Sequence, residues 1–126
     1  MKVFVSLLFT ILLTTKTFAQ QQDVVTVRDF RKGIKKEHPI ILDVRSPEEY
    51  AEGHIKNALN LNWQNPDEFA TLAARMQKSK PVYIYCRSGV RSAKAAEWLR
   101  SNGFTHIVGL DGGIKAWLDA DKRVVK

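Results

Sequence analysis

The chain contains a single cysteine among its 126 residues, and two arginines follow it closely. Cys86 comes directly after an apolar run at residues 81–85, and Arg87 and Arg91 lie on either side of Gly89. Positive charge nearby lowers the pKa of a thiol, and the thiolate is the nucleophilic form of cysteine. Glycine permits a tight loop that other residues resist. We therefore predict a nucleophilic Cys86 with a depressed pKa, although a lone cysteine is most often a buried structural residue.

The segment after Cys86 has the pattern of a loop that opens a helix, with Ser92 as the expected N-cap residue. A loop between a strand end and a helix N-terminus directs backbone N–H groups inward, and the helix dipole adds partial positive charge. No base stands beside the cysteine, and we expect His38, His54 and His106 to be structural or surface residues. Such a site suits the transfer of a soft anionic group, either sulfur or a phosphoryl group carried as cysteinyl phosphate.

The rest of the sequence alternates short apolar runs with helical patterns. We expect strands at residues 24–27, 40–44, 58–61, 81–86 and 106–110. We expect helices at residues 28–36, 66–76, 93–102 and 113–118, and a further helix with Ser46 as its N-cap residue. Nearly continuous apolar strands between helices predict an α/β domain, with a mostly parallel five-stranded sheet and helices on both faces. Ligand sites of such sheets lie at the carboxyl ends of the strands, where Cys86 stands.

The N-terminal residues have the three-part layout of a secretory signal peptide. Lys2 gives a positive start, residues 3–13 are apolar with two polar interruptions, and the small residues Thr17 and Ala19 stand at positions −3 and −1 of a cut before Gln20. The apolar run is too short to span the roughly 30 Å of bilayer hydrocarbon as a helix. We predict a cleaved signal peptide over residues 1–19, export to the periplasm, and a single domain over residues 20–126. An uncleaved anchor or an ordinary buried helix is the alternative.

The formal net charge of the chain is +7, from 20 basic and 13 acidic residues. Removal of Lys2 and Lys16 with the signal peptide leaves 18 basic residues and a net charge of +5. The remaining cations are spread along the chain without interleaved aromatic residues, which argues against nucleic acid and favours small anionic partners. A single cysteine excludes an intramolecular disulfide and a cysteine-rich zinc site. We expect no metal, no cofactor, no membrane anchor after cleavage, and a monomer.

Three segments resemble signatures of the rhodanese family of sulfurtransferases in its single-domain form. The first is LDVRSPEEY at residues 42–50, which leads into GHI at residues 53–55. The second is the loop CRSGVRS at residues 86–92, and the third is LDGGIKAW at residues 110–117. The segments stand in the order that the family has, and the resemblance extends over about residues 24–118. It implies a rhodanese fold for nearly all of the predicted mature chain.

The resemblance also implies that Cys86 carries a persulfide between two half-reactions. Its thiolate takes the outer sulfur of thiosulfate, sulfite leaves, and cyanide or a thiol then removes that sulfur. The backbone N–H groups of the loop bind the persulfide anion, and Arg87 and Arg91 help to hold the donor. The implied substrate-binding residues are Arg87, Ser88, Gly89, Val90, Arg91 and Ser92.

Two alternatives to sulfur transfer arise from the same loop. Cysteine phosphatases, rhodanese-like ones included, have a loop one residue longer than the six residues from Cys86 to Arg91, sized for phosphate or arsenate. The shorter loop favours sulfur transfer over phosphatase or arsenate reductase activity. The other alternative is a non-catalytic module that stores sulfur or binds a partner. The sequence names neither the physiological donor nor the acceptor.

Other residues of the matched segments are expected to support the site. Asp43 and Arg45 stand at the end of a buried strand, where a hydrogen-bonded charge pair is stable. Asn57 occupies a position where the family has glycine, and asparagine tolerates a left-handed backbone. Trp63 is expected either at the mouth of the pocket or packed on the surface. The residues expected to fix turns beside the loop are Glu49, His54, Gly112 and Gly113.

Overall fold

The computed structural model describes Val3 and residues 23–126, so the predicted signal peptide and its cleavage site lie outside the described residues. Strands and helices alternate along residues 23–126 in the order β1 (Asp23–Val25), α1 (Val27–Glu37), β2 (Ile40–Asp43), α2 (Pro47–Glu52), β3 (Leu59–Asn60), α3 (Pro66–Ala73), β4 (Val82–Tyr85), α4 (Val90–Ser101), β5 (Ile107–Leu110) and α5 (Gly113–Asp119). None of these described helices has the length and apolar character needed to cross a membrane.

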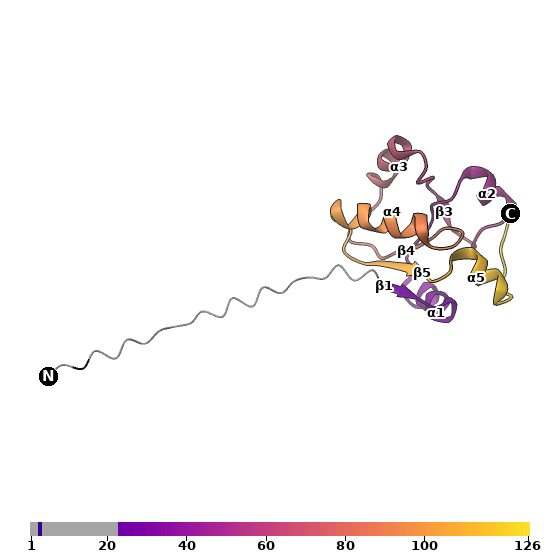
Figure 1. Cartoon of the computed structure of the whole chain (residues 1–126), viewed down its shortest axis with the longest axis horizontal. Coiled ribbons are helices and arrows are strands. Elements are labelled where there is room, and N and C mark those ends of the chain that lie inside the picture. The colour runs from indigo at the N-terminus through magenta and orange to yellow at the C-terminus, as the bar shows by residue number, and fades with distance from the viewer. Residues whose placement is uncertain (1–2, 4–22) are drawn as a thin grey trace.

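The strands of residues 23–126 form one five-stranded sheet in the order β1-β5-β4-β2-β3, and every neighbouring pair runs parallel. Helices α3 and α4 cover one face of the sheet, and α1 and α5 cover the other (Figure 1). The α/β fold with a parallel sheet, predicted from the apolar strands, is confirmed. Because all the strands point the same way, the segments that follow β2, β4 and β5 meet at one edge of the sheet.

Two apolar clusters, one on each face of the sheet, hold the layers together. The β4 strand contributes to both, because Val82 and Ile84 pack with α3 and α4 whereas Tyr83 and Tyr85 pack with α1 and α5. Cys86 continues the alternation and lies in the same cluster as Val82 and Ile84. Burial of one such side chain contributes roughly 1.5–3 kcal/mol to folding, so β4 is a rigid support for the residues that come after it.

The predicted elements are present, with bounds that differ by a few residues, and the main correction concerns α4. This helix begins at Val90 with Gly89 as its N-cap residue, so the prediction that Ser92 caps it is wrong. Gly89 has φ 114°, a left-handed conformation that starts the helix earlier than a serine cap would. Ser92 is buried in the first turn, where its hydroxyl donates to the Gly89 carbonyl at 3.1 Å.

Two other local predictions are confirmed. Asn57 adopts φ 69°, the left-handed backbone expected where the family has glycine. Ser46 forms a capping box, because its hydroxyl accepts from the N–H of Glu49 at 3.2 Å and its own N–H donates to the Glu49 carboxylate at 3.3 Å. Ser46 thus fixes the start of α2, and Asn57 permits the left-handed turn that precedes β3.

Candidate active site

Cys86 directly follows β4, at the edge where the parallel strands end. The β2 strand lies beside it, and the backbone N–H of Val44 donates to the carbonyl of Tyr85 at 3.0 Å. The cysteine residue is 1% exposed, so protein groups rather than bulk water surround it. The environment of its sulfur is therefore set by the loop and by the helices that contact the loop.

The loop folds back so that hydrogen-bond donors face the sulfur. The backbone N–H of Gly89 donates to Sγ of Cys86 at 3.1 Å, and the hydroxyl oxygen of Ser92 lies 3.4 Å from Sγ. The S–H donates to this oxygen in the thiol state, while the Ser92 hydroxyl donates to the Gly89 carbonyl. Because a hydroxyl proton rotates, Ser92 donates to the sulfur once the thiolate has formed.

Opposing effects act on the pKa of the Cys86 thiol. Burial raises the pKa, because a thiolate loses hydration in the protein interior. Hydrogen bonds from the Ser92 hydroxyl and from the backbone N–H groups of Ser92, Gly89 and Ser88 lower the pKa and outweigh burial. The pKa of Cys86 is therefore lowered, as the sequence predicts. The main groups that lower it are the Ser92 hydroxyl and the backbone N–H groups of the loop, rather than the two arginines.

The start of α5 holds the loop from the outside. The N–H groups of Ile114 and Lys115 donate to the carbonyls of Cys86 and Arg87 at 2.9 and 3.2 Å. The C=O and N–H of one trans peptide point in opposite directions, so anchoring the Arg87 carbonyl turns the N–H of Ser88 away from α5. That N–H is one of the groups that lower the pKa of Cys86. The sequence analysis does not predict that the backbone N–H groups of Ile114 and Lys115 hold the loop.

Two glycines stand at the start of α5, and the close approach to the loop explains the second of them. Gly113 has φ 61°, and a Cβ on it would lie 2.5 Å from the carbonyl carbon of Arg87 and 2.6 Å from the carbonyl oxygen of Cys86. Gly112 has φ 73° and is the N-cap residue of α5, with no side-chain capping bond. The structure thus places both glycines where a turn beside the loop is predicted, and Gly113 touches the loop itself.

Arg91 of the loop is paired with Glu49 of α2. Its two terminal guanidinium nitrogens donate to the two carboxylate oxygens of Glu49 at 2.7 and 2.9 Å. The hydrogen bond from Arg91 lowers the pKa of Glu49 to about 2, and the same bond raises the pKa of Arg91. Because Glu49 also closes the capping box with Ser46, it connects α2 to the loop. A direct role for Arg91 toward a donor stays a prediction.

Arg87 is the exposed cation of the loop. It lines an open depression of about 520 Å³ together with Lys115 and Leu118 of α5 and Glu52 of α2. Neither Arg87 nor Lys115 makes an ion pair with any residue that the structure describes. An anion that approaches the loop from this side meets these two unpaired cations, with the carboxylates of Glu49 and Glu52 in the same lining. The sequence analysis singles out Arg87 but not Lys115. The signal for Lys115 was its place in the GGIK segment, directly after the turn that contacts the loop.

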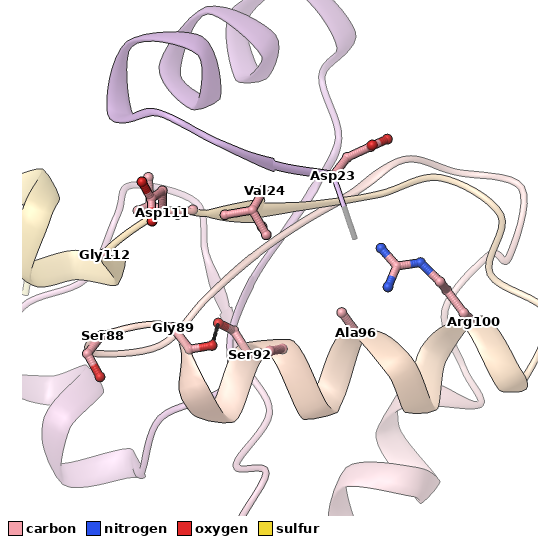
Figure 2. A pocket seen from close by; sticks show the side chains of 12 residues that line it. Asp23, Val24, Ser88, Gly89, Ser92, Ala96, Arg100, Asp111 and Gly112 are labelled. Atoms are coloured by element: carbon pink, nitrogen blue, oxygen red, sulfur yellow. Dashed lines mark hydrogen bonds between the residues drawn. The ribbon is translucent and has the colours of Figure 1, made fainter. Parts of the chain in front are cut away.

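A smaller cavity of about 160 Å³ lies between α4 and the strands β1 and β5. Figure 2 shows Ser88, Gly89 and Ser92 at one end of it, and Ala96 and Arg100 further along α4. Cys86 does not line this cavity. Ser92 belongs to both environments, because it lines the cavity and its hydroxyl lies 3.4 Å from the sulfur.

The predicted pair of Asp43 and Arg45 is present at the end of β2. Both residues are buried, and Nη2 of Arg45 donates to Oδ2 of Asp43 at 2.7 Å and to the carbonyl of Gly53 at 2.7 Å. The second bond fixes the turn after α2. The pair therefore acts on the structure near the loop, and neither residue is hydrogen-bonded to the sulfur.

His54 and Trp63 have structural contacts. Nδ1 of His54 lies 2.9 Å from the carbonyl of Tyr50, and the two rings stack with centroids 3.6 Å apart. The backbone of His54 also pairs with Val125. Trp63 packs edge-on against Phe69 with centroids 5.0 Å apart, so of its two expected places the packed one is found.

The sequence and the structure both have relatives among known proteins. The rhodanese-like domain matches residues 26–120. The uncharacterized protein YqhL of Bacillus subtilis is 38% identical over 104 residues, which make up 80% of this chain and 79% of YqhL. Thiosulfate sulfurtransferase GlpE of Coxiella burnetii is 38% identical over 84 residues, which make up 67% of this chain and 76% of GlpE. The crystal structure of a rhodanese-related protein from Thermoplasma volcanium has a TM-score of 0.71 at 31% identity and covers 82% of this chain and 97% of that one.

Relatives with other names share the same domain. Protein HIGH ARSENIC CONTENT 1, mitochondrial, of Arabidopsis thaliana is 32% identical, over 79% of this chain and 64% of that protein. The tRNA uridine(34) hydroxylase of Wigglesworthia glossinidia brevipalpis is also 32% identical, over 79% of this chain and 32% of that enzyme. The names of these relatives differ in activity, whereas the rhodanese-like domain model matches nearly all of the described part of this chain. The chain therefore belongs to the rhodanese-like domain family.

Proposed function

We propose that the protein is a thiosulfate sulfurtransferase that carries sulfane sulfur on Cys86. The observation that carries the proposal is the convergence of donors on Sγ, with the N–H of Gly89 at 3.1 Å and the hydroxyl of Ser92 at 3.4 Å. Fixed dipoles of this kind stabilise a sulfur anion both before and after it accepts another sulfur. The name of the GlpE relative supports the same reaction.

In the first half-reaction, the Cys86 thiolate attacks the outer sulfur of thiosulfate. A new S–S bond forms to Sγ, the S–S bond of thiosulfate breaks, and its electron pair leaves with sulfite. The product is a persulfide anion on Cys86: the outer sulfur keeps the negative charge that it had in thiosulfate, the charge of the thiolate leaves with sulfite, and no proton needs to move. This balance fits a loop that offers N–H donors and contains no histidine or carboxylate between residues 86 and 92.

In the second half-reaction, cyanide or a thiolate attacks the outer sulfur of the persulfide. The bond from Sγ to that sulfur breaks, thiocyanate or a new persulfide leaves, and the Cys86 thiolate is regenerated. Arg87 and Lys115 are the cations that an anionic donor or acceptor meets first, because they line the depression beside the loop and have no ion pair within the described residues. No second cysteine can remove the sulfur, so the acceptor is a separate molecule.

A second candidate is phosphatase or arsenate reductase activity, which the name of the relative HIGH ARSENIC CONTENT 1 supports. The six residues from Cys86 to Arg91 argue against it, since the phosphatase loop is one residue longer.

Mass spectrometry of the protein after treatment with thiosulfate tests the proposal. We expect Cys86 to gain one sulfur atom and to lose it on addition of cyanide, with thiocyanate formed in equal amount. A Cys86→Ser variant is expected to remain folded and to gain no sulfur. Absence of the added sulfur, or turnover of an aryl phosphate or arsenate by the unmodified chain, would contradict sulfur transfer.

The same experiment separates an enzyme from a sulfur-storing module. An enzyme releases sulfite and thiocyanate over many cycles, whereas a storage module gives a single stoichiometric exchange. We expect multiple turnovers with parallel lines in double-reciprocal plots, as a ping-pong cycle requires.

We further propose that the protein is exported to the periplasm, cleaved after Ala19 and monomeric. The support for export is the charged start and apolar run of residues 1–19. Intact-mass measurement of the protein from fractionated cells is expected to find a chain that begins at Gln20, and size-exclusion chromatography is expected to find one copy. A full-length mass in the cytoplasmic fraction would contradict export.

A further inference from the structure

A groove on the α1 side of the molecule is lined by five cations. The groove has a volume of about 560 Å³ and lies between α1 and the segment after α5. The cationic residues that line it are Arg28, Arg31, Lys32, Lys35 and Lys122. Thr26, Val27 and Ala120 complete its lining, and no acidic or aromatic residue is among them. Together these eight residues form a surface that we call the basic groove.

The positive charge of the basic groove is not compensated within the chain. None of the five cations makes an ion pair with a residue that the structure describes. Acidic neighbours in sequence, Asp29, Asp119 and Asp121, do not line the groove. Residues 1–22, which the structure describes only at Val3, include no aspartate or glutamate in their sequence. The charge is therefore available to a molecule outside the chain.

The placement of four cations on α1 is itself unfavourable. Arg28 and Lys32 are four residues apart, as are Arg31 and Lys35, and like charges at this spacing on a helix repel each other. Phe30 of the same helix is buried against the sheet, which fixes the rotation of α1 and keeps the cations turned toward the groove. A row of unpaired cations that is held together in this way points to an anionic ligand.

We propose that the basic groove binds an acidic, extended polypeptide segment of a partner protein. A hollow suits an inserted chain better than the flat surface of a bilayer, and Val27 and Ala120 offer apolar contacts between the charges. The lining has no aromatic ring on which a nucleic-acid base could stack. Arg28 and Lys32 are about 6 Å apart along the helix axis, which is close to the roughly 6.6 Å between carboxylates on alternate residues of a strand.

The basic groove begins at the functional edge of the sheet. Thr26, its first residue, directly follows β1, and all strands are parallel, so this end of α1 lies at the edge that also carries Cys86. A partner held by the groove is thus placed at the same edge as the loop. The proposal concerns binding alone and holds whether or not Cys86 transfers sulfur.

Fluorescence anisotropy with a labelled peptide of alternating glutamate and alanine tests the proposal. The mature chain is expected to bind this peptide at about 50 mM salt and to lose affinity as salt rises, because exposed charges are screened. The same peptide with glutamine in place of glutamate is expected not to bind. The double variant Arg31→Glu, Lys35→Glu is expected to weaken binding by about tenfold or more, since like charges are then opposed.

A matched control uses the double variant Lys78→Glu, Lys80→Glu, which changes the net charge equally on an exposed segment away from the groove. It is expected to bind the peptide within about twofold of the unmodified chain. Both variants are expected to keep the circular dichroism spectrum and the rate of Cys86 alkylation. Equal losses in the two variants would overturn the groove as the site. Absence of peptide binding, or groove-dependent binding of anionic phospholipid vesicles or polyphosphate in its place, would overturn the acidic peptide as its ligand.

Discussion

The helices of residues 23–126 differ in how their first N–H groups are satisfied. Helices α1, α2 and α3 each begin with a side-chain cap, provided by Thr26, Ser46 and Asn65. Helices α4 and α5 begin at Gly89 and Gly112, and no side chain caps either of them. A side-chain cap consumes N–H groups that a helix N-terminus otherwise leaves free.

The two uncapped helices use those free groups for the site. The amides at the start of α4 face the Cys86 sulfur, and the amides at the start of α5 bind the carbonyls of Cys86 and Arg87. One helix therefore holds the anion, and the other holds the loop that surrounds the anion. Glycine at these two positions provides no side-chain cap and so stabilises the helix less. The backbone N–H groups at the helix start remain available to bind the sulfur and the loop.

The largest effect is expected from Gly113→Ala. The new Cβ would overlap the backbone of Arg87 and Cys86, at a residue whose φ is already 61°. We expect the free energy of unfolding to fall by about 3 kcal/mol, and sulfur transfer to fall on the order of 100-fold because the loop is displaced. Urea unfolding and thiocyanate formation measure the two effects.

Gly89→Ala is the matched control for this first prediction. Its φ is 114°, but a Cβ there meets nothing within 4 Å, so only backbone strain is added. We expect a smaller loss of stability, about 1–2 kcal/mol. An equal or larger loss in Gly89→Ala would mean that contact between α5 and the loop is not what requires glycine at position 113.

A second effect is expected from Ser92→Ala, which removes the one side-chain donor at the sulfur among the described residues. The pKa of Cys86 is expected to rise, because burial then acts against one hydrogen bond fewer. Sulfur transfer near neutral pH is expected to fall roughly tenfold, as for loss of a hydrogen bond to a charged group. The rate of alkylation of Cys86 as a function of pH measures the shift.

Ser88→Ala provides the comparison for Ser92. Ser88 acts on the sulfur through its backbone N–H, which alanine keeps. The midpoint of the alkylation profile is therefore expected to stay in place. A midpoint that moved upward equally in both variants would show that hydroxyl groups in general, and not the Ser92 contact, set the pKa of Cys86.

The sequence predicts the fold and the position of Cys86 at the end of a buried strand well, because both depend on local patterns. Apolar runs mark the strands, and Cys86 with the glycine after it marks the loop. The cap of α4 is mispredicted because a serine before an apolar stretch is a typical cap, whereas here the sulfur and the Gly89 carbonyl use its hydroxyl. The pairing of Arg91 with Glu49 joins residues far apart in sequence, and no local pattern indicates it.

A third effect concerns this pairing and its dependence on pH. The pKa of Glu49 is lowered from 4.5 to about 2 in the folded chain, so its bond to Arg91 stabilises the fold fully above about pH 4.5. That contribution is lost as the pH falls through about 2, where the folded carboxyl takes up its proton. We expect Glu49→Gln to lower the free energy of unfolding by about 1 kcal/mol at neutral pH, a modest value because the pair is partly exposed.

Urea unfolding of both proteins between neutral and acidic pH tests the third prediction. The two curves of unfolding free energy are expected to converge as the pH approaches 2. A difference that stays constant across this range would show that the carboxylate charge of Glu49 is not what stabilises the loop.

The smallest effect on the sulfur site is expected at a helix whose cap serves only the helix. Asn65 accepts from the N–H of Glu68 and donates to the Glu68 carboxylate at 2.9 Å, on the exposed start of α3. Asn65→Ala is expected to lower the free energy of unfolding by about 1 kcal/mol. The alkylation profile of Cys86 and the rate of thiocyanate formation are expected to stay unchanged, because no atom of this cap touches the loop. A shift in that profile would mean that α3 also positions the sulfur site, and the distinction between side-chain-capped and glycine-capped helices would then fail.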